Sequence, residues 1–189
     1  MMEEKELKII YAEDVPQQDF RPIPWQLRME AQESGMKSFY SAHWVYPKPA
    51  EGEAPAPRAA VVPEQYAAPP EAPAPGKLTI HPPHEHKENE VIMLIGGDPY
   101  DPYDLGATVE FSFGEDMKKY TFTRSVTIMI PGGMPHGFYN IVECRRPFMF
   151  ISSREAESLS EKFRWDQLTE EQNAQVAHRD FWKDVGYDD

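Results

Sequence analysis

The sequence predicts a mainly β protein, an antiparallel sandwich or barrel of jelly-roll type. Short segments rich in β-branched and aromatic residues follow one another from residue 77 to 152. Turn sequences such as GGDPYDPYD, FGED and PGGMPHG separate these segments. No long helical period interrupts the series. Regular short strands joined by turns are typical of antiparallel all-β architectures, of which the jelly roll is one.

The residues before the barrel divide into an extension and a linker. In the extension, residues 1–46, Gln26 to Ser34 has helix-forming composition and SFYSAHWVY from Ser38 predicts a strand. This strand is too aromatic to remain in water, so we expect the extension to pack on the barrel. Residues 47–75 are rich in proline and alanine, which neither extend a sheet nor build a core. They predict a semi-extended linker or, alternatively, an arm anchored by Val61, Val62 and Tyr66.

The barrel is expected at residues 76–152. Its predicted strands are LTI, EVIMLIG, GATVEFSF, KKYTFT, VTIMIP and RPFMFIS. Residues 153–189 have helical spacing and a capping candidate at Thr169, which predicts one or two C-terminal surface helices.

Charge and cysteine content exclude several classes of function. The chain has 32 acidic and 19 basic residues and a net charge of −13, so its surface repels nucleic acid and anionic membranes. The single cysteine, Cys144, forms no internal disulfide, and MMEEKELKII is not of signal-peptide type. No apolar run approaches the roughly 20 residues that span a bilayer. We therefore expect a soluble cytoplasmic protein.

The stretch HPPHEHKENE, residues 81–90, raises the question of a metal site. His84 and His86 are two positions apart at a strand edge, where an extended backbone points both imidazoles to the same face. Glu90 has the same parity. Taken alone, the pattern fits either a metal site or a solvated loop.

A second stretch, PGGMPHGFYN, completes a pair of motifs that resembles the cupin superfamily. The first motif of that family has the form HxH, three or four residues, Glu, six residues, Gly, and the chain matches it with His84, His86, Glu90 and Gly97. The second has the form PxG, two residues, His, three residues, Asn. The chain matches it with Pro131, Gly133, His136 and Asn140.

Two turn positions depart from the family pattern. The glycine usual six positions before the first histidine is here Gly76, eight positions before it, and Ser125 replaces a glycine before the second motif. Both concern the shape of a loop and not a ligand.

The resemblance implies a jelly-roll barrel with one divalent metal ion, Fe, Mn, Ni or Zn, bound by His84, His86, Glu90 and His136. Ligand type alone does not name the ion. Four protein ligands on an octahedral ion leave two positions for substrate or oxygen.

Other conspicuous side chains receive separate expectations. Tyr139 is the candidate catalytic residue, as a proton donor or acceptor. With Tyr139, three arginines could orient a carboxylate or phenolate, namely Arg124, Arg145 and Arg146. Parity places four apolar side chains inside the barrel: Ile92, Leu94, Phe111 and Phe113. Asn140 is expected to hydrogen-bond the turn around His136. The remaining polar candidates are expected to be packing or surface residues, or solvated neighbours of the site: His43, His81, Glu85, Lys87, Glu88, Cys144 and His178.

Three functions fit these observations. The first is a metal-dependent enzyme acting on a small organic molecule, of dioxygenase, lyase, isomerase or decarboxylase type. The second is a non-catalytic protein that binds a small ligand for sensing or sequestration, and the third is a structural barrel that presents its flanking segments to a partner protein. An aromatic N-terminal strand on a long linker also predicts a homodimer, in which the strand covers a neighbour's sheet edge.

Overall fold

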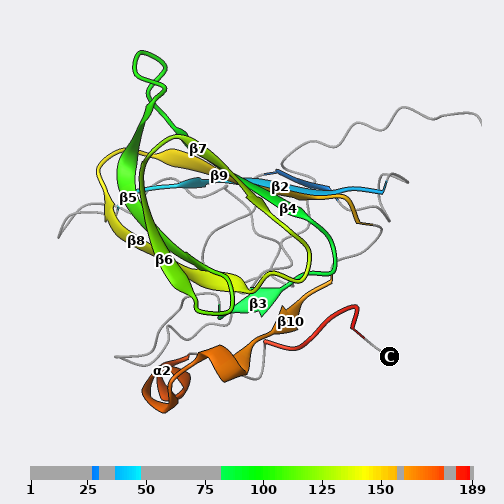
Figure 1. Ribbon diagram of the computed structural model, residues 1–189. Helices are drawn as coiled ribbons and strands as arrows, with labels where there is room; N and C mark the ends of the chain where they lie inside the picture. Colours follow the sequence, from blue (N-terminus) through cyan, green and yellow to red (C-terminus); the bar gives the residue numbers. More distant parts are fainter. Residues whose placement is uncertain (1–26, 30–36, 48–81, 157–159, 177–181, 188–189) are drawn as a thin grey trace, which may run out of the picture.

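The computed structural model describes residues 27–29, 37–47, 82–156, 160–176 and 182–187. Its strands are β1 (Leu27–Met29), β2 (Phe39–Val45), β3 (His84–Glu85), β4 (Glu90–Gly96), β5 (Asp104–Phe113), β6 (Lys118–Arg124), β7 (Val126–Ile130), β8 (His136–Cys144), β9 (Phe148–Arg154) and β10 (Lys162–Phe163). A 3₁₀ helix, η3 (Trp165–Gln167), and a short helix, α2 (Glu170–Gln175), follow. Within these residues two antiparallel sheets, in the orders β1-β2-β9-β4-β7 and β10-β3-β8-β5-β6, enclose the core (Figure 1). The predicted mainly β jelly-roll barrel is confirmed.

Most predicted strands of the barrel are present, with two corrections. The strand from Ser38 corresponds to β2, but the helix expected from Gln26 is wrong for Leu27–Met29, which pair as β1 with β2. Pairing at a sheet edge overrides the local helix propensity there. Strand β8 was not expected, because its first residues belong to the second motif and resemble a turn. Residues 48–81, which include the linker and LTI, lie outside the described residues.

The inner face of the first sheet changes from polar to apolar along its strands. Register aligns β2, β9 and β4 in transverse rows. The rows are given from the end of the barrel that carries His84 and Glu90 inward. They are Phe39–Arg154–Glu90, Ser41–Ser152–Ile92 and His43–Phe150–Leu94, followed by Val45–Phe148. Charged groups therefore gather at one end of the barrel.

The apolar end of the barrel is the core. Nine buried side chains form one cluster: Val45, Ile92, Leu94, Leu105, Ala107, Val109, Phe111, Ile130 and Phe148. The predicted inward residues Ile92, Leu94 and Phe111 belong to it, and Phe113 packs against it. Full burial of each large side chain contributes about 1.5–3 kcal/mol. This core fixes the strands that carry the polar end.

A β-bulge in β8 decides which side chains of that strand face inward. Gly137 and Phe138 have φ values of 151° and 50°, and the pairing with β5 shifts register between Glu110 and Ser112. The extra residue resets the alternation, so His136 and Tyr139 both face the interior, whereas Asn140 is exposed. Gly137 is also required by space, since a Cβ there would lie 2.8 Å from the Cα of Pro83.

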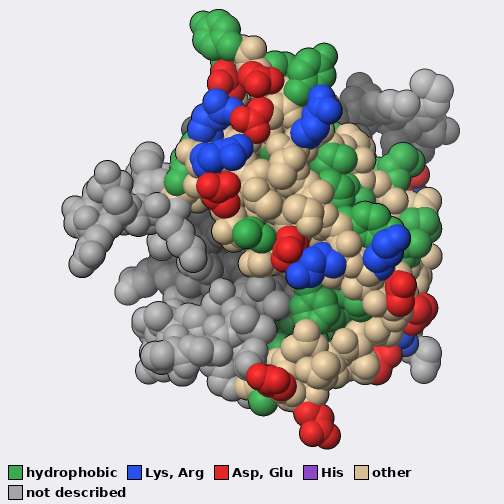
Figure 2. Space-filling view, turned by 60° about the vertical axis from the view of Figure 1, so that its left-hand side comes forward, with side chains coloured by type: hydrophobic (Ala, Val, Ile, Leu, Met, Phe, Trp, Pro, Cys, Tyr) green, Lys and Arg blue, Asp and Glu red, His purple; other side chains and the backbone are tan. Residues whose placement is uncertain are grey.

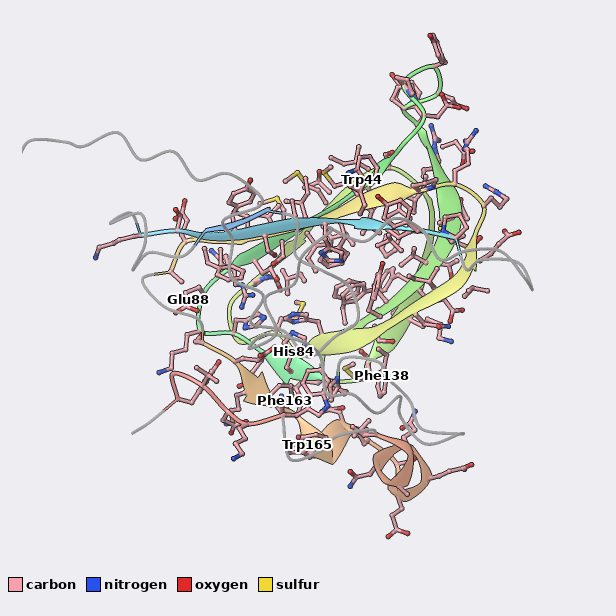
Figure 3. All side chains as sticks on the ribbon, turned by 180° about the vertical axis from the view of Figure 1, so that it is seen from behind. Trp44, His84, Glu88, Phe138, Phe163 and Trp165 are labelled. Atoms are coloured by element: carbon pink, nitrogen blue, oxygen red, sulfur yellow. The ribbon has the colours of Figure 1, made fainter. Side chains whose placement is uncertain are left out.

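The described C-terminal residues, 160–176 and 182–187, lie at the end of the barrel that carries His84 and His86. Strand β10 pairs with β3, placing Phe163 opposite His84, and Figure 3 shows Phe163 and Trp165 beneath His84. Phe163 packs with Val176 and Trp182 in a second small core. Within the described part of this segment, helical structure is limited to α2, where Thr169 and Gln172 form a capping box, and to η3. No helix among the described residues has the length and apolarity needed to cross a membrane.

Candidate metal centre

Four side chains from both sheets converge at the polar end of the barrel. His84 lies on β3, His86 just after it, Glu90 at the start of β4 and His136 at the start of β8. His84 and His136 are direct partners in the β3–β8 pairing. One potential ligand atom from each of the four residues lies within 4.8 Å of the others, and each residue is at most 6% exposed. The structure thus joins the two motifs, some fifty residues apart, in one site.

Backbone carbonyls orient the three imidazoles. Nδ1 of His84 lies 2.9 Å from the carbonyl oxygen of Pro82, and Nδ1 of His136 lies 2.9 Å from that of Met134. Nδ1 of His86 bonds the carbonyl oxygen of Ser160. Because a carbonyl only accepts, each Nδ1 carries the hydrogen in a neutral ring, and each Nε2 keeps its lone pair for a metal.

The atoms that face one another in the cluster lack hydrogen bonds. Oε2 of Glu90 lies 3.0 Å from Nε2 of His136 and 3.4 Å from Nε2 of His86. Yet neither Glu90 Oε2 nor His136 Nε2 has a hydrogen-bond partner among the described residues. Buried, unpaired acceptors each cost about 1–3 kcal/mol, and a shared cation removes that cost. The donor set therefore fits a divalent metal ion.

The second oxygen of Glu90 is held separately. Ser152, in the adjacent row on β9, donates a 2.5 Å hydrogen bond from Oγ to Glu90 Oε1. Burial raises the pKa of the Glu90 carboxyl. The imidazoles of His136 and His86 and the charge of Arg154 lower it by more than burial raises it, so the net pKa is well below the ordinary value. The Glu90 carboxyl is therefore ionised at neutral pH.

Arg154 is a member of the site that no motif indicated. It is only 8% exposed, its Nε lies 3.7 Å from Glu90 Oε1, and its guanidinium carbon lies 4.6 Å from the ring centre of Phe39. Its Nη1 lies 3.0 and 3.2 Å from the two ring nitrogens of His86. If Nη1 lay in the plane of the imidazole at these distances, it would collide with Cε1, the carbon between the two ring nitrogens. Nη1 therefore lies over the face of the His86 ring. The in-plane lone pair of His86 remains available.

Ser160 and Glu161 also join the site from the C-terminal segment. Besides its carbonyl, Ser160 uses Oγ to accept from the backbone N–H of Lys87 at 2.9 Å and to donate to Glu88 at 2.5 Å. Oε1 of Glu161 lies 3.7 Å from His84 Nε2. The β3–β10 pairing brings these residues near the histidines. No local sequence pattern predicts this pairing.

The structure corrects several expectations for neighbouring residues. Glu85 is not a solvated neighbour, since it pairs with Arg164 at 3.0 Å, and Glu88 bonds Ser160. Lys87 is exposed, as expected. Asn140 does not hold the turn around His136 but donates to Glu110 at 3.4 Å on the surface. His81 and His178 lie outside the described residues.

The three predicted arginines lie on the outside of the barrel. Arg146 pairs with Asp98 at 3.0 Å and with Asp104, and Arg145 lies 3.4 Å from Asp104. Arg124 is exposed and stacks 6.0 Å from the ring centre of Tyr103. Figure 2 shows such mixed charges at the end of the molecule from which the β4–β5 loop projects.

Three further predicted residues lie in or against the barrel interior. Tyr139 has a buried hydroxyl without a hydrogen-bond partner among the described residues, and burial raises the pKa of its phenol far above the ordinary value. Its ring lies 5.4 Å from that of Phe111 and 5.3 Å from that of Phe150, centre to centre. His43 stacks on Phe150 at 5.1 Å, and Cys144 is half-buried against the core, so both are packing residues as expected.

Both motifs therefore place their histidines and glutamate in one buried site at the end of a two-sheet jelly roll. This is the arrangement that the resemblance to the cupin superfamily implies. No protein-family model matches the sequence. No curated protein matches it either.

The solved structures that are similar to this chain have low sequence identity to it. The polyketide cyclase RemF from Streptomyces resistomycificus matches with a TM-score of 0.47 and 12% identity over 89% of this chain and 91% of its own. An oxalate decarboxylase matches with 0.42 and 8% over 72% of this chain, and an oxalate oxidase bound to glycolate with 0.41 and 13% over 72%. This chain spans 27% and 53%, respectively, of those two proteins. At these scores nothing about substrate or reaction follows from the likeness.

Proposed function

We propose that this chain is a metal-dependent cupin enzyme that acts on a small organic molecule. The observation that carries the proposal is the buried cluster of three imidazoles and one carboxylate whose facing atoms, Glu90 Oε2 and His136 Nε2, lack partners. A divalent metal bound there would supply Lewis-acid activation of substrate oxygens or, for a redox-active ion, activation of dioxygen. Imidazole and carboxylate donors are compatible with Fe, Mn, Ni and Zn, so the donors do not select one of these ions.

The chain's own groups would prepare this site in advance. Three carbonyls fix the imidazole planes, and Ser152 fixes the carboxylate of Glu90, so little ordering remains when a metal binds. With four protein ligands, an octahedral ion keeps two positions for oxygen atoms of a substrate.

Tyr139 is the residue that we propose for hydrogen bonding or proton donation to substrate. Its phenol stays protonated at neutral pH because burial raises the pKa of the hydroxyl. It lies three positions after His136 along β8, which is at most about 10 Å of strand. A substrate that reaches from the metal to Tyr139 therefore extends into the aromatic part of the barrel.

Metal analysis and oxygen consumption would test the reaction type, which is either a dioxygenase or a lyase, isomerase or decarboxylase. Protein purified without chelators should contain about one divalent ion per chain. Oxygen uptake with candidate diols or organic acids, lost in His136→Ala, selects the dioxygenase. Turnover without oxygen uptake selects the second group. A metal-loaded protein that binds ligands but converts none of them would contradict enzymatic function and favour sensing or sequestration.

We also propose that the protein is a cytoplasmic homodimer. A single half-buried cysteine is consistent with a reducing compartment. On the outer face of the first sheet, Met129 is 79% exposed and Ile95 is 40% exposed, which supports association through an apolar surface. Light scattering at micromolar concentration should give twice the chain mass, and a monomer would contradict this proposal.

A further inference from the structure

Arg154 is a buried cation whose nearest described carboxylate, Glu90, lies 3.7 Å away, beyond hydrogen-bond distance. It makes no hydrogen bond to a carboxylate or carbonyl among the described residues, and its Nε is buried and unpartnered. Glu90, the nearest carboxylate, already receives a hydrogen bond from Ser152 on Oε1 and faces the imidazoles with Oε2. If Glu90 binds a metal, its charge is shared with that ion. A buried charge of this kind is costly unless a partner completes it.

Two other buried donors lie in the same interior without partners. Ser41 is fully buried, and neither its Oγ nor the hydroxyl of Tyr139 has a hydrogen-bond partner among the described residues. Ser41 is opposite Ser152 in the β2–β9 pairing, one row from Arg154. Neighbouring rows on one face of a strand are about 7 Å apart. Among the described residues, three buried donors that lack hydrogen bonds therefore lie between the metal cluster and the core, on the inner faces of the sheets.

The charges of the site point in the same direction. A divalent ion bound at the cluster would, together with Arg154, bring three positive charges beside the two negative charges of Glu90 and Glu161. In a buried site of low dielectric the residual positive charge favours an anionic ligand. On the core side of this site lie the aromatic rings of Phe111, Tyr139 and Phe150, which contact one another.

We infer that the interior beside the metal cluster is a receptor for an organic anion, whose carboxylate or enolate oxygen is bound by Arg154 and Ser41 and whose apolar body lies against the aromatic side chains. This deepens the proposed function by naming the substrate class, and Arg154 is its specificity-determining residue. A guanidinium can donate two parallel hydrogen bonds to a carboxylate, which sets the orientation of the ligand. Tyr139 then meets the far end of the ligand.

Calorimetric titration of the metal-loaded protein with benzoate and benzamide would test this inference. Benzoate should bind at least tenfold more tightly than benzamide, which has the same shape without the charge. Arg154→Gln should weaken benzoate binding about 10- to 100-fold, because it removes a charged hydrogen-bond donor, with manganese affinity within about threefold of the parent. Arg154→Lys keeps the charge and should retain part of the affinity. Ser41→Ala should weaken benzoate by about fivefold without loss of stability.

Arg124→Gln is the matched control, since Arg124 is exposed on β6, and it should bind benzoate as the parent does. Equal binding of benzoate and benzamide, or unchanged benzoate binding in Arg154→Gln, would overturn the inference. Loss of manganese binding in both Arg154→Gln and Arg154→Lys would also overturn it, because Arg154 would then be part of the metal site's own framework. These titrations do not measure turnover. A protein that binds benzoate but converts no substrate would therefore contradict the proposed enzymatic function and leave the anion receptor standing. If the protein converts neutral substrates but no anionic ones, the anion receptor is contradicted and the proposed enzymatic function is not.

Discussion

Removal of the Ser152 hydroxyl would measure how strongly the barrel orients its metal ligands. Ser152→Ala deletes the donor of the 2.5 Å hydrogen bond to Glu90 Oε1 and changes no ligand. Both residues are 5% exposed, so bulk water does not replace the donor. Partners that hold a metal ligand in place typically contribute 10- to 100-fold in affinity. That range corresponds to about 1.4–2.8 kcal/mol of binding free energy.

Calorimetric titration of metal-free protein with manganese or zinc would give this affinity directly. Ser153→Ala is the matched control, because Ser153 is the next residue of β9 and the alternation of the strand points it away from the interior. We expect a 10- to 100-fold weaker dissociation constant for Ser152→Ala and no change for Ser153→Ala. An unchanged affinity in Ser152→Ala, or an equal loss in both variants, would refute the argument that this bond orients Glu90.

Three more changes have defined outcomes. His84→Ala or His136→Ala should abolish stoichiometric metal binding in elemental analysis, together with any metal-induced rise in melting temperature; retained binding would contradict the assigned ligands. Tyr139→Phe should raise the free energy of unfolding by about 1 kcal/mol, because it removes a buried, unpartnered hydroxyl. Since the folded pKa of Tyr139 is raised above 10.0, the parent should lose stability as pH rises through 10 and the variant should lose less, which urea titrations at pH 8 and 11 would show. Gly137→Ala should destabilise the fold by about 1–3 kcal/mol and weaken metal binding, because its Cβ would meet Pro83; unchanged thermal unfolding would contradict the close approach.

The members of the His/Glu cluster were predictable because their information is local. His84, His86 and Glu90 share one short stretch, and His136 follows a strand in a second one, so spacing alone proposes the set. The structure brings them together as expected. The supporting residues were not predictable in this way. Arg154 reaches Glu90 through the β4–β9 pairing, and Ser160 reaches His86 from 74 positions away.

Alternation failed as a guide where the backbone is irregular. Counting from His136 by twos points Asn140 inward and Tyr139 outward, but the bulge at Gly137 and Phe138 reverses this. The sequence marks the bulge only by a glycine that is also part of the motif. The helix expected from Gln26 was wrong at Leu27–Met29 for a related reason, because pairing with β2 is a tertiary effect that composition does not report.

The C-terminal segment has a thermodynamic connection to the metal site. It pairs Phe163 with His84, bonds His86 through the carbonyl of Ser160 and places Glu161 near the same rings. A ligand that binds only when these imidazoles are correctly placed must stabilise whatever places them, by an amount that grows with its affinity. Metal binding and docking of this segment are therefore linked, and the two sequence motifs describe the ligands of a site whose geometry also depends on residues 160–163.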